Sequence, residues 1–206
     1  MLAGAAVFAM TACGGSKAPL SAIEDVFFND VQPGNGYNMS RWESRAIDLK
    51  SALEGQTFDV EVADPEGSPF TIEHPFTVGH VQDNPRDGWL PQILLQGTIT
   101  TEDYDKILHE TLGYMGTLNV TLYGVDEEGK YHLVAALKFN EDAAPIYDPD
   151  THELHLVAKI GAEHISVSNE RKLRQIAHCT RFVITYDPLP SAEKIEQEAF
   201  ANDNED

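Results

Sequence analysis

The sequence predicts a mainly β protein, in its simplest form an antiparallel β-sandwich of the immunoglobulin-like or a similar kind. About seven short apolar segments with strand-like composition follow one another, and turns rich in Gly, Pro, Asp and Asn separate them. Long helical patterns do not alternate with these segments, which argues against a doubly wound α/β sheet. We expect two or three short helices beside the sheets, and a β-barrel is the alternative architecture.

The first element after the N-terminal region has two interpretations. Ser21 and Glu24 have the spacing of a capping box, which would open a short helix through Val31. The apolar run at residues 26–28 fits a first strand almost as well. The sequence leaves this element open.

The clearest helix follows a loop of turn residues at 32–36. Ser40 is its predicted cap, Glu43 completes a capping box, and Gly55 comes just after its end. Four apolar residues recur at i, i+4, i+7 and i+11, and we expect this stripe to face the core: Trp42, Ala46, Leu49 and Leu53.

The β region begins at residue 57. Residues 57–62 alternate between apolar and acidic side chains and predict one strand with a single buried face. Extended segments follow at residues 70–74 and 76–81, and then at residues 90–100, where Gly97 suggests a β-bulge. A short helix is predicted to start at residues 101–103, with Tyr104, Ile107, Leu108 and Leu112 as its apolar face.

The strongest β signal is a hairpin of residues 118–125 and 130–139 around the turn at 126–129. Further strands are predicted at residues 153–160 and 180–186. Between these two strands, Ser168 is the expected cap of a helix over residues 169–178. We expect the apolar residues of this helix to face the protein core: Leu173, Ile176 and Ala177. Its basic residues should face water: Arg171, Lys172 and Arg174.

The chain is strongly acidic. Its 206 residues contain 14 Lys+Arg and 34 Asp+Glu, which gives a formal net charge of −20. Such a chain is repelled by phosphate backbones, so we expect no nucleic-acid partner. The simplest interpretation is that the acidic side chains lie on a solvated surface, which keeps the protein soluble and repels neighbouring molecules.

A short apolar segment near the N-terminus ends in small residues and a cysteine. Residues 2–12 are apolar or small apart from Thr11, and Cys13 is followed by the flexible stretch at residues 14–16. This eleven-residue segment matches the length of a signal-peptide core and is too short to span a bilayer. This order resembles a bacterial lipoprotein signal peptide with its lipobox. The alternative is an apolar N-terminal helix packed on the core, with Cys13 as a buried thiol.

The lipoprotein resemblance implies how the chain is processed and where the protein is located. Residues 1–12 would be the signal peptide, Cys13 the lipidated first residue of the mature chain, and residues 13–20 a tether. Gly14 stands where the inner-membrane retention signal of enteric bacteria has Asp, so the expected location is the bacterial outer membrane. The composition also resembles that of uncharacterised envelope lipoproteins of Bacteroidota. Residues 21–190 would form a single domain and residues 191–206 an acidic mobile tail.

No catalytic motif is recognisable, so we assign no catalytic residue, no cofactor and no metal ligand. Cys179 follows His178 directly, and neighbouring side chains point apart, so Cys179 is interpreted as a buried free thiol. His152 and His155 are spaced too closely for the zinc motif His-Glu-x-x-His. The acidic turns at 126–129 and 148–150 lack the EF-hand spacing, and a Ca²⁺ site there stays open without named ligands.

Aromatic residues in loops are the remaining candidates for ligand contact: Tyr37, Trp42, Trp89, Tyr114 and Tyr147. Trp89 is the best of them because it lies between Asp87-Gly88 and Leu90-Pro91, outside any apolar stripe. It could stack on a sugar ring or bind a partner protein, or it could close one end of the core.

Three hypotheses of function follow from this sequence. The first is a non-enzymatic binding or accessory module of the envelope, held by its lipid anchor and engaging a glycan or a membrane-complex partner. The second is a structural or assembly lipoprotein whose only partner is another protein. The third, and weakest, is a hydrolase that uses a dispersed pair of carboxylates.

Overall fold

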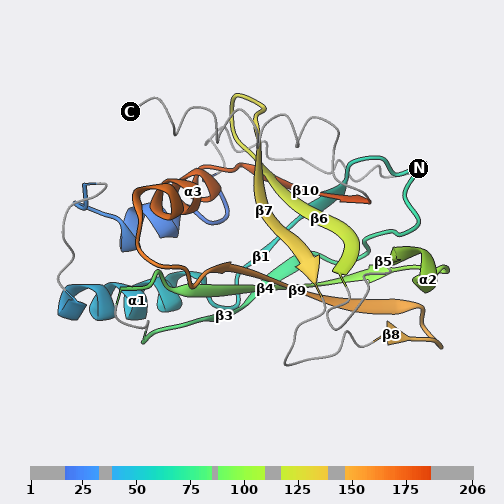
Figure 1. The fold of residues 1–206 in the computed structure, drawn as a ribbon, viewed down its shortest axis with the longest axis horizontal. Coiled ribbons are helices and arrows are strands. Elements are labelled where there is room, and N and C mark those ends of the chain that lie inside the picture. The colour runs from blue at the N-terminus through green and yellow to red at the C-terminus, as the bar shows by residue number, and fades with distance from the viewer. Residues whose placement is uncertain (1–16, 33–38, 85–87, 110–116, 139–146, 187–206) are drawn as a thin grey trace, which may run out of the picture.

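The protein consists of two β-sheets with short helices at their ends (Figure 1). The computed structural model describes residues 17–32, 39–84, 88–109, 117–138 and 147–186. Four helices are described: the π-helix η1 (Ile23–Phe27), α1 (Met39–Leu53), α2 (Tyr104–Ile107) and α3 (Val167–Ala177). The strands are β1 (Thr57–Phe58), β2 (Val60–Val62), β3 (Phe76–Val81), β4 (Gln92–Thr100), β5 (Leu108–His109), β6 (Thr117–Val125), β7 (Tyr131–Lys138), β8 (Tyr147–Asp148), β9 (Glu153–Gly161) and β10 (Arg181–Tyr186).

The two sheets differ in strand direction. The first is antiparallel with the order β1-β3-β4-β9-β8. The second has the order β2-β10-β6-β5, and β7 also pairs with β6. A mainly β fold with few short helices is therefore confirmed. The prediction that all strands are antiparallel is wrong for the second sheet, because β2 runs parallel to β10. Neither sheet closes into a barrel within the described strands.

The segment predicted as one strand at residues 57–62 belongs to both sheets. Its first part, β1, pairs with β3 of the first sheet, and its second part, β2, pairs with β10 of the second. The chain changes sheet at Asp59. Alternation continues across this break, since Phe58 and Val60 are both buried. The ring of Phe58 lies 4.8 Å from the Phe182 ring in β10 and 6.4 Å from the Phe76 ring in β3, which joins the sheets.

Helix α1 confirms the predicted apolar stripe. All four of its stripe residues are buried, and Trp42 packs edge-on against Phe27 of η1 at 4.8 Å. The helix begins at Met39, so Ser40 lies within its first turn rather than before it. Gly55 follows its end with φ +85°, a left-handed conformation that glycine adopts without strain. The element before α1, for which the sequence allowed either a helix or a strand, is the π-helix η1, which buries Ile23 and Phe27.

Helix α3 departs from prediction in two ways. Its cap is Ser166, whose hydroxyl accepts a hydrogen bond from the N–H of Asn169 at 3.1 Å, and not Ser168. Leu173, Ile176 and Ala177 are buried as expected. Arg174, however, is largely buried rather than turned to water. Its long side chain reaches η1, as described below.

The remaining elements follow the sequence pattern with local differences. The hairpin of β6 and β7 and the strands β9 and β10 are confirmed. Residues 70–74 form only an isolated bridge between Thr71 and Thr100, because Pro75 interrupts the pattern. Helix α2 ends at Ile107, and Leu108 enters β5 instead. The irregularity near Gly97 lies in the partner strand, where the register shifts between Val78 and His80.

Gly97 is explained by packing rather than by a bulge. Its register with β9 is regular, and a Cβ atom at this position would overlap the ring of Phe76. We predict that Gly97→Ala lowers the free energy of unfolding by about 1–3 kcal/mol because the ring must move within a dense core. The double variant Gly97→Ala, Phe76→Leu should lose less than the two single changes combined, as measured by urea unfolding. Additive losses would contradict this explanation.

Candidate functional site

Trp89 is positioned by a short antiparallel pairing at one end of the first sheet. The Leu90 N–H donates to the Glu163 carbonyl at 2.9 Å, and the Ile165 N–H donates to the Gly88 carbonyl at 2.9 Å. Trp89 and His164 are the paired residues between these two bonds. The chain before β4 and the chain after β9 therefore hold these two side chains together, because β4 and β9 are neighbours along their whole length.

The two rings form a pair at the surface. The indole of Trp89 and the imidazole of His164 lie 4.9 Å apart at an interplanar angle of 39°. Trp89 is half-buried and His164 is exposed. Trp89 belongs neither to the core cluster nor to the half-buried side chains that pack against it among the described residues. This Trp89–His164 ring pair is thus partly exposed at the surface.

Helix α3 begins directly beside the ring pair. The Asn169 side-chain amide donates to the His164 carbonyl at 2.8 Å, which fixes the His164 backbone to the first turn of the helix. Val167, at the start of the helix, is 49% exposed. His164 carried no signal in the sequence, because its partner Trp89 lies 75 positions away and only the sheet register brings them together.

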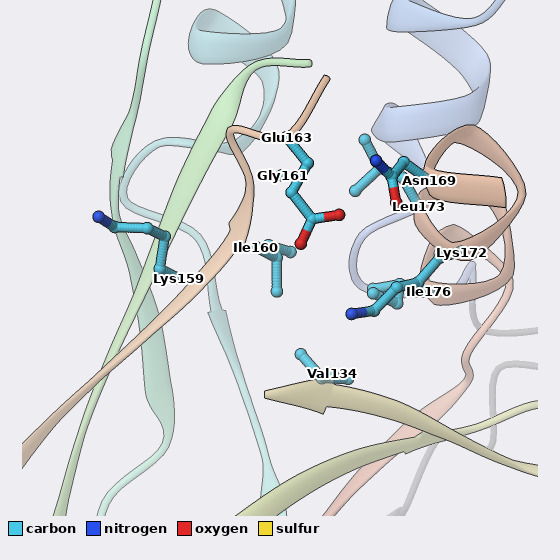
Figure 2. Close-up of a pocket in the computed structure, with 9 residues that line it drawn as sticks. All are labelled: Val134, Lys159, Ile160, Gly161, Glu163, Asn169, Lys172, Leu173 and Ile176. Carbon is cyan, nitrogen blue, oxygen red and sulfur yellow. The ribbon is translucent and has the colours of Figure 1, made fainter. Parts of the chain in front are cut away.

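A small cavity adjoins this site between β9, β7 and α3 (Figure 2). Figure 2 shows the carboxylate of Glu163 and the amine of Lys172 pointing into it, whereas Lys159 points away. Its volume of about 30 Å³ is enough for a water molecule or two and too small for a sugar or a metabolite. A ligand larger than water that contacts the ring pair must therefore lie on the surface and not in this cavity.

In the two acidic turns, aspartate carboxylates accept hydrogen bonds from backbone N–H groups of the same turn. Asp126 Oδ1 accepts from the N–H groups of Glu128 and Lys130, at 3.0 and 2.9 Å, while Asp126 Oδ2 lies 2.8 Å from His132 Nε2. Asp148 Oδ1 accepts from the Asp150 N–H at 2.8 Å. In the described part of the chain, no group of three or more His, Cys, Asp or Glu side chains is placed to hold a metal ion.

The two histidines at 152 and 155 make separate contacts. His152 precedes β9 and its Nδ1 lies 3.2 Å from the Tyr147 hydroxyl. His155 lies within β9 and its Nδ1 is 2.8 Å from the Thr98 hydroxyl. Tyr147 in turn stacks on Tyr104 at 4.5 Å, so it packs at the opposite end of the sheets from α3.

Cys179 is a buried free thiol, as the sequence indicated. Burial, and to a smaller extent the nearby Asp126 carboxylate, raises the pKa of its thiol to about 12. Its Sγ donates to the Gln175 carbonyl at 3.3 Å and occupies the space above Gly124. A thiol in this setting stays protonated at neutral pH and fills space rather than attacking a substrate.

Arg174 forms a second cluster, between η1 and α3. Its guanidinium pairs with Glu24 and with Glu170 (3.1 Å), donates to the Val31 carbonyl at 2.9 Å, and lies 4.2 Å over the ring of Phe28. Beside it is an open polar hollow of about 620 Å³. These contacts join η1 to α3, while Arg174 Nε and Glu24 Oε2 are buried without a hydrogen-bond partner among the described residues.

Comparison of the chain with protein-family models, with curated proteins and with solved structures finds no match. Within the described residues, no helix combines the length and the apolar character needed to cross a bilayer.

The burial of Cys179 predicts slow thiol chemistry. In the native Cys13→Ala chain, Ellman's reagent at pH 8 should leave Cys179 unreacted, because the thiolate is scarce and access is blocked. In urea the same thiol should react completely. Rapid reaction in the native state would contradict the buried position.

The turn at Asp126 predicts a loss of stability in acid. Burial opposes its ionisation, but hydrogen bonds from His132, Lys130 and Glu128 outweigh burial and lower the pKa of Asp126. The ionised form therefore stabilises the fold above the unfolded pKa of about 3.9, and this contribution disappears as the pH falls through the lower folded value. Urea unfolding from pH 7 to pH 2 should show a steeper loss for the unchanged chain than for Asp126→Asn. Equal losses would contradict this role.

Proposed function

We propose that this protein is a lipid-anchored binding module of the bacterial outer membrane, with Cys13 as its anchor and the Trp89–His164 ring pair as its contact for a glycan. The anchor rests on the lipobox-like residues before Cys13. The contact rests on one observation: a half-buried indole and an exposed imidazole, 4.9 Å apart, held at one end of the first sheet. An immunoglobulin-like sandwich is part of the same proposal.

The ring pair has the properties that a sugar ring requires. The face of a sugar presents C–H groups that pack on an aromatic ring, while its hydroxyl groups need polar partners at the edge. Trp89 supplies the aromatic surface, and His164 supplies an exposed polar group beside it. The site is made of backbone pairing between chain segments, so it is preformed and loses little entropy on binding.

The tether places the domain close to the membrane. Residues 18–21 are already fixed to the domain, because the Ser21 N–H donates to the Ala18 carbonyl at 2.9 Å and Leu20 is fully buried. Lys17 also pairs with Asp25 of η1. Lys17 follows Cys13 by four residues, which extend over at most about 14 Å. With Cys13 acylated, the end of the domain that carries η1 lies next to the bilayer surface.

A protein partner is the second candidate for the same site. The start of α3 beside the ring pair exposes Val167, and an aromatic side chain next to an exposed aliphatic one is typical of a contact centre between proteins. A protein ligand would extend over Val167, whereas a sugar would contact the rings alone.

Removing the acylated residue should release the protein. In a bacterial host that processes lipoproteins, Cys13→Ala should move the chain from the membrane fraction to the soluble fraction, because acyl chains supply the membrane affinity. Cys179→Ala is the matched control and should remain in the membrane. Retention of the Cys13→Ala chain in the membrane would contradict the anchor.

Binding should depend on the indole. In a thermal-shift panel of glycans, one class should raise the melting temperature of the Cys13→Ala chain in a concentration-dependent way. Trp89→Ala should abolish this shift, while Ile47→Ala, which changes a large exposed apolar side chain on α1, should keep it. A shift that survives Trp89→Ala would place the glycan elsewhere. A surface variant at Val167 that alone abolishes capture of a partner protein would favour the second candidate.

A further inference from the structure

The cavity between β9, β7 and α3 holds two opposite charges that have no partner. Figure 2 shows the Glu163 carboxylate entering from the chain after β9 and the Lys172 amine entering from α3. Among the described residues, no hydrogen bond or ion pair engages either group, and the two groups are not paired with each other. Charges that face one space without a partner mark a place where a polar group is missing.

The inner wall of the same cavity is apolar. Its four apolar residues come from β7, β9 and α3 and are at most 3% exposed: Val134, Ile160, Leu173 and Ile176. Glu163 and Lys172, in contrast, are exposed residues. The cavity therefore has a charged opening and an apolar interior, and a group that fills it must be apolar at its inner end and polar at its outer end.

The two charges restrict the chemistry of that group. A simple anion would be attracted by Lys172 and repelled by Glu163, and a simple cation would meet the reverse. A group that donates to the carboxylate and accepts from the amine satisfies both. A trans amide does this from one plane, because its N–H and its carbonyl point in opposite directions. This matches a carboxylate and an amine that enter from opposite walls.

The size of the cavity restricts the group further. Its volume of about 30 Å³ accommodates about two groups of the size of a water molecule. A methyl group and a carbonyl group fill such a space, with the N–H of the amide at the opening. Those three parts together are an acetamido group, and the body of the molecule that carries it stays outside.

We propose that this cavity, which we call the acetamido cavity, receives the acetamido group of an N-acetylated sugar. The N–H of the sugar's amide donates to the Glu163 carboxylate, the Lys172 amine donates to its carbonyl, and its methyl group packs on the apolar wall. The inference rests on the proposed function in one respect, that the ligand is a glycan, and it adds the class of sugar. It does not require the same sugar unit to contact the Trp89–His164 ring pair.

A titration with simple sugars tests the class of ligand. The full chain carrying Cys13→Ala is titrated with N-acetylglucosamine, glucosamine and glucose, and binding is followed by saturation-transfer NMR. N-acetylglucosamine should bind at least about tenfold more tightly than the other two, because only its amide satisfies both charges. Its acetyl methyl protons should receive more saturation than its ring protons, because the methyl group lies inside the protein.

Two lysine variants test the position of the group. Lys172→Met should weaken binding of N-acetylglucosamine about tenfold, because it removes a charged hydrogen-bond donor and keeps the length of the side chain. Lys159 lines the same cavity and points away from it, so Lys159→Met is the matched control with the same change in net charge and should bind normally. Both lysines are exposed, and equal melting temperatures of the two variants check that both fold.

Three results would overturn the inference. Equal affinity of the Lys172→Met and Lys159→Met chains would show that the acetamido group lies elsewhere. Glucose that binds as tightly as N-acetylglucosamine would show that the group is not recognised. N-acetyl-lysine that binds as tightly as N-acetylglucosamine would show that the cavity accepts an acetamide from a protein as readily as from a sugar, which contradicts the assignment to a sugar.

The same chains separate this inference from the proposed function. Binding that is lost in Trp89→Ala and kept in Lys172→Met would contradict the acetamido cavity and support the ring pair. Binding that is lost in Lys172→Met and kept in Trp89→Ala would support the cavity and contradict the ring pair as the glycan contact. Absence of binding to every glycan would contradict both.

Discussion

The packing of Phe58 between the two sheets is the contact on which the rest of the fold depends. Its ring meets Phe182 of the second sheet at 4.8 Å and Phe76 of the first at 6.4 Å, at the point where the chain passes from one sheet to the other. Because β1 and β2 are so short, their hydrogen bonds alone fix this crossing weakly. The buried aromatic cluster fixes it firmly and sets the relative position of both sheets.

Helix α3 contacts both parts of the molecule that the proposed function involves, η1 next to the tether and the Trp89–His164 ring pair. In one direction, Arg174 reaches Glu24 and the Val31 carbonyl, and so ties the helix to η1 and the tether. In the other direction, Asn169 holds the backbone of His164. Five residues, about 7.5 Å of helix, separate these two contacts. A ligand at the ring pair would thus bind beside a helix that is fixed at both contacts, near the end of the domain that the proposed anchor holds at the membrane.

Local sequence patterns predicted the helices and strands, whereas long-range contacts determine how the strands are divided between the sheets and which charged side chains are buried. The stripe of α1 and the β6–β7 hairpin follow from periods of 3.6 and 2, which are properties of short segments. The change of sheet at Asp59 could not be predicted, because the alternation runs through it unbroken. Arg174 looked like a solvent-facing residue for a similar reason: its partner Glu24 lies 150 positions earlier in the chain.

The sequence predicted one of the two residues of the candidate site. Trp89 stood out because it lies in a loop between turn residues, whereas His164 became its partner only through the pairing of β4 with β9. The cap of α3 illustrates the same limit at short range. Ser166 and Ser168 are equally good capping residues, and the position at which the preceding pairing ends, at Ile165, selects the first of them.

The fluorescence of Trp89 tests the central claim most directly. The chain has two tryptophans, and Trp42→Phe leaves Trp89 as the only one while keeping an aromatic ring against Phe27. Titration of this variant with the glycan class that stabilises the protein should shift the indole emission saturably and protect it from acrylamide quenching, because the sugar covers the exposed ring face. Emission and quenching that stay unchanged at saturating glycan would contradict a binding site at the ring pair.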